Sequence, residues 1–147
     1  MKTLVCTLMV CGLLLGHLLS PTSLYAEEMF ILRSTAKTPD AVVEAVKTYA
    51  EGKKWQYLGA DKVKQGEITL VKICIPAVGQ QLWPVGLHLS AMLPCGNLGV
   101  YSKAGQTEIA LLHARYMQVL YPHPAVEKAS ATAQPLLLEM LDAVTTP

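Results

Sequence analysis

The sequence contains none of the motifs that mark the common kinds of catalytic site. It has no G-x-S-x-G nucleophile turn, no H-E-x-x-H zinc motif and no glycine-rich phosphate loop. No pair of neighbouring carboxylates stands at the end of an expected strand, and the C-x-x-C spacing of thiol oxidoreductases is also missing. These absences favour a protein without enzymatic activity over a hydrolase or a transferase.

An excess of either charge is missing as well. The chain has 12 Lys and Arg against 11 Asp and Glu, and the counts balance once Lys2 is removed. A surface that binds phosphates needs clustered positive charge. The one basic cluster, Lys53 and Lys54 with Lys62 and Lys64, is typical of a solvated face beside a strand. The sequence therefore excludes nucleic acid as a partner.

A secretory signal precedes the domain. Lys2 supplies the positive start, residues 4–19 form the apolar run, and a polar Ser-Pro-Thr-Ser segment follows. We expect cleavage after Ala26, so that residues 1–26 are the signal and residues 27–147 form one domain in the periplasm or outside the cell. Leu24 is large for this position, which leaves retention as an N-terminal anchor open. The membrane would then be contacted only through the uncleaved signal.

The first half of this domain predicts a strand, a helix and two more strands. Residues 29–33 and 55–58 read as short strands, and residues 67–75 alternate along a longer strand that ends near Cys74. Between the first two, Thr38 is expected to cap a helix that starts at Pro39 and stops at Gly52.

The second half predicts short helical turns at residues 77–83 and 87–93, a turn at 94–97, and a hairpin of strands 98–101 and 108–112. A last helix is expected over residues 125–144, kinked or split by Pro135 near Gln134. The order β-α-β-β-α-β-β-α indicates an α+β domain. Its two layers should be a mostly antiparallel sheet and helices packed on one face of that sheet.

Several segments carry a resemblance to a known family. They are residues 71–76, 93–101, the following hairpin and residues 114–117, with Cys74, Pro76, Leu93, Pro94, Cys95, Val100 and Tyr101 at the characteristic places. From residue 30 to residue 144 the chain resembles the "domain of unknown function 302" family. Ile75, where a polar residue is usual, and Pro135 depart from the pattern. The resemblance implies a compact α+β domain that can dimerise, and it implies no established reaction, substrate or cofactor.

Cys74 and Cys95 are the cysteines that remain after the signal, and two interpretations stay open. If the two lie within bonding distance, they form a structural disulfide in an oxidising compartment. Alternatively, Cys74 and Cys95 use their thiols directly, in redox chemistry or with His88 and Met92 as soft ligands for copper or zinc. Spacings of four and three would put His88, Met92 and Cys95 on one side of a helical turn.

Two functions follow from this. The first is a non-enzymatic binding domain of the cell envelope that holds an unknown small ligand or an envelope protein, in a groove between sheet and helices or at a homodimer surface. The second is a metal-handling or thiol-redox protein built on Cys74 and Cys95. The sequence His113-Ala114-Arg115-Tyr116 directly after a strand is expected to cap a helix rather than to bind an anion.

Overall fold

One five-stranded antiparallel sheet organises the domain. The computed structural model describes residues 29–93 and 97–146. The strands lie in the order β1-β5-β4-β3-β2, and every neighbouring pair is antiparallel. They comprise β1 (Phe30–Thr35), β2 (Gln56–Val63), β3 (Ile68–Cys74), β4 (Asn97–Lys103) and β5 (Gln106–Leu112).

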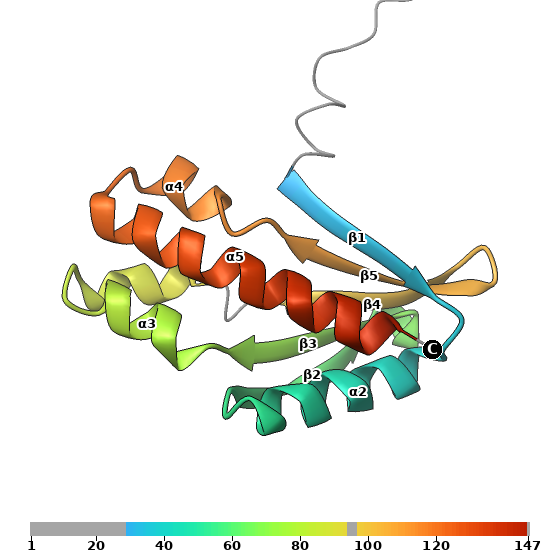
Figure 1. Ribbon diagram of the computed structural model, residues 1–147. Helices are drawn as coiled ribbons and strands as arrows, with labels where there is room; N and C mark the ends of the chain where they lie inside the picture. Colours follow the sequence, from blue (N-terminus) through green and yellow to red (C-terminus); the bar gives the residue numbers. More distant parts are fainter. Residues whose placement is uncertain (1–28, 94–96, 147) are drawn as a thin grey trace, which may run out of the picture.

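The helices cover one face of this sheet (Figure 1). They are α2 (Pro39–Gly52), α3 (Pro76–Leu82), α4 (Tyr116–Leu120) and α5 (Pro124–Thr145), with 3-10 turns η1 (Lys64–Gly66) and η2 (Leu87–Met92). The predicted α+β class, with helices on one side of an antiparallel sheet, is confirmed. Within the described ranges, no helix is long and apolar enough to cross a membrane.

The start of α2 is as the sequence predicts. The Thr38 side chain accepts a hydrogen bond from the Ala41 amide at 3.3 Å, and Pro39 occupies the first turn. Capping satisfies an amide that the helix itself leaves unpaired. Val42, Val46 and Ala50 then recur on the side that faces the sheet and are fully buried.

Alternation along β3 separates the two faces of the sheet. Thr69, Val71 and Ile73 are buried under the helices, whereas Ile68, Leu70, Lys72 and Cys74 point to the other face and are half-buried. That face has no helix over it in the described part of the chain (Figure 1). The core therefore lies in one layer, between the sheet and the helices.

Helix α5 crosses the whole length of the sheet and continues through Pro135. The expectation that Pro135 splits this helix is wrong. A proline removes one amide from the helical ladder, but here its ring is on the exposed side. Ala133 and Leu137, on either side of it, are fully buried. Packing on the sheet along both halves therefore keeps the helix in one piece.

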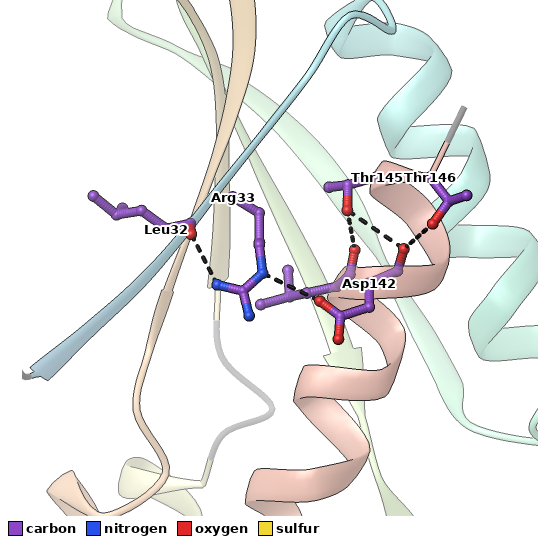
Figure 2. A network of polar contacts seen from close by, with 6 residues as sticks. Leu32, Arg33, Asp142, Thr145 and Thr146 are labelled. Atoms are coloured by element: carbon purple, nitrogen blue, oxygen red, sulfur yellow. Dashed lines mark hydrogen bonds and ion pairs between the residues drawn. The ribbon is translucent and has the colours of Figure 1, made fainter.

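The end of α5 is fastened to β1 and to the segment after it. Arg33 pairs through Nε with the Asp142 carboxylate at 3.2 Å and donates to the Leu32 carbonyl oxygen at 3.1 Å (Figure 2). The Thr35 hydroxyl donates to the Thr145 carbonyl at 3.0 Å, and the Lys37 ammonium donates to the Val144 carbonyl at 3.1 Å. Thr35 and Lys37 thus satisfy carbonyls that the last turn of the helix leaves free.

Candidate functional site

A pocket lies at one end of the sheet. We call this end the turn end, because the β2–β3 and β4–β5 turns, the start of α2 and the end of α5 meet there (Figure 1). A groove of about 610 Å³ lies between the first turn of α2, the β2–β3 turn and the neighbouring ends of β3 and β4. This volume is in the range of pockets that hold small molecules.

An unusual backbone shapes the β2–β3 turn beside this groove. Lys64, Gln65 and Gly66 have φ values of 50°, 56° and 92°, which are three consecutive left-handed residues. Only glycine adopts this region without steric cost. The turn folds sharply enough to bring Lys64 and Glu67 to the rim of the groove.

Two ion pairs form the rim of the groove. The Lys62 ammonium lies 3.3 Å from the Asp40 carboxylate in the first turn of α2, and the Lys64 ammonium lies 2.6 Å from that of Glu67. All four side chains are exposed, and exposed pairs contribute only about 0–1 kcal/mol each. A charged ligand can therefore replace one side chain of such an ion pair at little cost in free energy.

Thr69 forms part of the groove wall, and its surroundings are different. The residue is only 5% exposed, and its hydroxyl makes no hydrogen bond to any described residue. The hydroxyl is not a fully buried unpaired group, so solvent in the groove reaches it. The Thr69 hydroxyl is therefore available to a molecule in the groove.

Tyr101, on the outer lip, belongs to a separate polar cluster. Its hydroxyl donates to the Glu108 carboxylate at 2.5 Å, and Lys103 contacts the same carboxylate at 3.2 Å. The hydrogen bond to Glu108, followed by burial, raises the pKa of Tyr101 to about 12. The same bond lowers the pKa of Glu108. Tyr101 thus stays protonated at neutral pH and acts as a donor rather than as a base.

The residues that line the groove are suited to binding a small molecule. The lining contains no cysteine or histidine. In the parts of the chain that the structure covers, no group of three or more His, Cys, Asp or Glu side chains could hold a metal ion. The arrangement offers a recess, charges of both signs at its rim and one hydroxyl without a protein partner in its wall.

The cysteine predicted from the sequence lies at the opposite end of the sheet. Cys74 is the last residue of β3, is half-buried on the uncovered face and pairs with Gln56 of β2. Cys95 lies outside the described residues. The β3–β4 ladder pairs Lys72 with Asn97, so Cys74 follows this pair by two residues in the sequence and Cys95 precedes it by two. A disulfide between the two cysteines stays a prediction.

His88 and Met92 do not have the arrangement expected from their spacing. The segment is the 3-10 turn η2, in which residues three apart share a side, so the four-residue spacing from His88 to Met92 separates them. The His88 ring packs against Tyr121 at 6.0 Å, whereas Met92 is half-buried against the core. A metal site on Cys74, Cys95, His88 and Met92 stays a prediction. The expected alignment of His88 and Met92 on one side of an α-helical turn is not what the structure has.

His113 lies in the turn before α4, where the sequence favours a capping or surface role over anion binding. Its Nδ1 accepts from the Arg115 amide at 3.1 Å, directly before α4, and its own amide donates to the Met29 carbonyl at 2.7 Å. Burial, and to a smaller extent the positive charge of Arg115, lower the pKa of His113. The ring is therefore held neutral, as an acceptor of the amide requires.

Sequence reasoning assigned Lys62 and Lys64 to a solvated face and gave Thr69 no role. Thr69 stands in the sequence where a buried strand residue is expected, and nothing nearby marks its hydroxyl as unpaired. A Lys-Gln-Gly segment between two strands does signal a turn. The groove itself depends on how this turn meets the start of α2, about twenty residues earlier in the chain.

Comparison with family models and with curated proteins gives no match. A solved structure does match: the crystal structure of the uncharacterized conserved protein DUF302 from Bacillus stearothermophilus, with a TM-score of 0.70 and 17% sequence identity. The alignment covers 79% of this chain and 98% of that one. The chain has the DUF302 fold. The resemblance seen in the sequence is thereby confirmed at the level of the fold.

Proposed function

We propose that the chain is a non-enzymatic binding domain of the cell envelope, and that the groove at the turn end holds a small polar ligand. The observation that carries this proposal is the Thr69 hydroxyl, which lies in the groove wall without a protein partner and is open to the groove. A ligand atom can hydrogen-bond to it in place of water. The signal at residues 1–26 supports a site of action beyond the cytoplasmic membrane.

The rim of the groove limits the class of ligand. Asp40 and Glu67 offer two negative charges, and Lys62 and Lys64 offer two positive ones. A molecule with both a carboxylate and an amine can pair with a lysine and with a carboxylate of this rim at the same time. We therefore expect a small zwitterion or a neutral polar molecule rather than an anion or an apolar compound.

Two threonine variants test this proposal. The full chain is screened by thermal shift against amino acids, organic acids, polyamines and sugars, and a ligand should raise the melting temperature of the wild type. Thr69→Val removes the hydroxyl at nearly constant shape and should abolish that rise. Thr107→Val is the matched control, since Thr107 is also buried at the turn end but does not line the groove.

Each outcome of this screen has a plain meaning. A rise that is lost in Thr69→Val and kept in Thr107→Val supports the groove as the site. An equal rise in wild type and Thr69→Val would contradict it, and so would a screen in which only anions or apolar compounds stabilise the chain.

Metal handling or thiol-redox chemistry at Cys74 and Cys95 remains the alternative. Cys74 is half-buried at a strand end, and Cys95, His88 and Met92 would have to complete the site. Elemental analysis of protein purified from the periplasm decides between the two. Copper or zinc in stoichiometric amount, lost in Cys74→Ser, would favour the alternative over the binding domain.

A further inference from the structure

Exposed large hydrophobic side chains gather at the end of the sheet opposite the groove. Leu87, Val119 and Leu120 are 75%, 71% and 64% exposed, and Trp83 at the end of α3 is 40% exposed. We call this end, where β1 begins and β5 ends, the apolar end. Its exposed side chains are Phe30, Trp83, Leu87, Leu112, Val119, Leu120 and Tyr121.

Contacts between the elements hold the segments that carry these side chains next to one another. The Tyr116 hydroxyl of α4 donates to the Met92 carbonyl of η2, and the Tyr121 ring packs against His88, next to Leu87. The hydrogen bond from His113 to the Met29 carbonyl ties the segment before α4 to the start of β1. In Figure 1, α3, α4 and the start of α5 lie together at this end.

The apolar end is also poor in charge. The sequence has no Asp, Glu, Lys or Arg from residue 73 to residue 102, nor from residue 116 to residue 126. These two stretches contain α3, η2, α4 and the start of α5. Soluble surfaces normally mix charges of both signs, and an exposed apolar patch without them marks an interaction site.

The preceding chain points to the occupant of this surface. The apolar run at residues 4–19 is separated from Met29, at the apolar end, by about ten residues. Extended chain spans at most about 3.3–3.6 Å per residue, so the reach from the run to the domain is at most about 35 Å. Retention of residues 4–19 as an N-terminal anchor, the alternative to cleavage after Ala26, would hold the apolar end beside the bilayer surface.

We propose that the apolar end binds the surface of a lipid bilayer, with Leu87, Val119 and Leu120 entering the boundary between headgroups and acyl chains. Trp83 and Tyr121 combine an apolar ring with a polar atom and suit the same depth. Because α4 and η2 lack cationic residues, the attraction comes from apolar burial and not from lipid charge. This surface is separate from the groove and does not depend on the ligand proposed for it.

The two tryptophans allow a direct test in the full chain. In Trp55→Phe, Trp83 is the only remaining tryptophan, and the protein is incorporated into phosphatidylcholine vesicles with brominated acyl chains. We expect Trp83 emission to shift to shorter wavelength and to lose most of its intensity. Adding an anionic lipid or salt should change neither the shift nor the loss. In the control Trp83→Phe, the remaining Trp55 packs against the core and should be unaffected.

A surface variant separates the domain from its N-terminal segment. Leu87→Gln with Val119→Gln and Leu120→Gln changes exposed positions only, so the fold should persist, as circular dichroism would verify. This variant should still sediment with vesicles through residues 4–19 but should lose the quenching of Trp83. Two results would overturn the proposal. The first is that lipid does not quench Trp83 in the Trp55→Phe chain that keeps Leu87, Val119 and Leu120. The second is a blue shift that grows with protein concentration in the absence of lipid, which would mean that a second copy of the chain covers this end.

Discussion

The two ends of the sheet differ in the chemistry of their exposed side chains. At the turn end, Asp40, Lys62, Lys64 and Glu67 surround a recess with an unpaired hydroxyl in its wall. At the apolar end, α3, η2 and α4 contain no formal charge and leave leucine and valine side chains in solvent. One end suits a small polar molecule, whereas the other suits an apolar surface. The two proposals would place recognition of a ligand and attachment to a membrane at opposite ends of a single helix, α5.

Breaking the covalent link expected at the apolar end should have the largest effect on stability. If Cys74 and Cys95 form a disulfide, the closed loop of about 20 residues contributes about 3 kcal/mol. Cys74→Ser should then lower the free energy of unfolding by this amount in urea titrations, and reductant should lower that of the wild type equally. Reductant should leave Cys74→Ser unchanged. Thiol labelling of Cys74 and Cys95 in the folded, unreduced chain would contradict the prediction.

A smaller effect is expected from the backbone of the turn end. Gly105 in the β4–β5 turn has a φ of +79°, so Gly105→Ala should cost about 1 kcal/mol of unfolding free energy. Gly52 at the end of α2 is the control, because a Cβ there meets no atom and needs no left-handed backbone. Gly52→Ala should be neutral or slightly stabilising. Equal losses in both variants would show that turn geometry is not what distinguishes this end.

The smallest effect concerns pH at the apolar end. The pKa of His113 is lowered in the folded state, so the neutral ring is favoured by folding. The stability from this source is complete above the unfolded pKa of about 6.5 and is lost as the pH falls below it toward the folded pKa. His113→Asn keeps an acceptor for the Arg115 amide but does not titrate. In urea titrations at pH 7 and pH 5 this variant should lose less stability than the wild type, whereas His88→Asn, at an exposed position, should behave as the wild type does.

Local sequence signals predicted most of the fold. The Thr38 cap, the stop of α2 at Gly52 and the alternation along β3 depend on neighbouring residues, and all three are confirmed. The length of β2 was underestimated, since its second half is exposed and polar and carries little strand pattern. The course of α5 through Pro135 could not be read locally, because packing of distant segments decides it.

The candidate site was harder to predict for the same reason. A lone histidine, methionine or cysteine is visible in a sequence, and so His88, Met92 and Cys74 attracted attention. An unpaired hydroxyl is defined by what surrounds it in space, and Thr69 acquires its place only when α2 and the β2–β3 turn meet. The 3-10 geometry of η2 is likewise a result of tertiary packing rather than of spacing.

The order of the strands has a consequence for how the chain folds. Residues 30–35 of β1 pair only with residues 107–112 of β5, so the first strand to emerge has no partner until most of the chain is available. Contacts between residues so far apart in sequence slow folding, since a long loop must close before they form. During synthesis β1 therefore has no strand to pair with until β5 has been made. The topology thus makes completion of the sheet depend on synthesis of most of the chain.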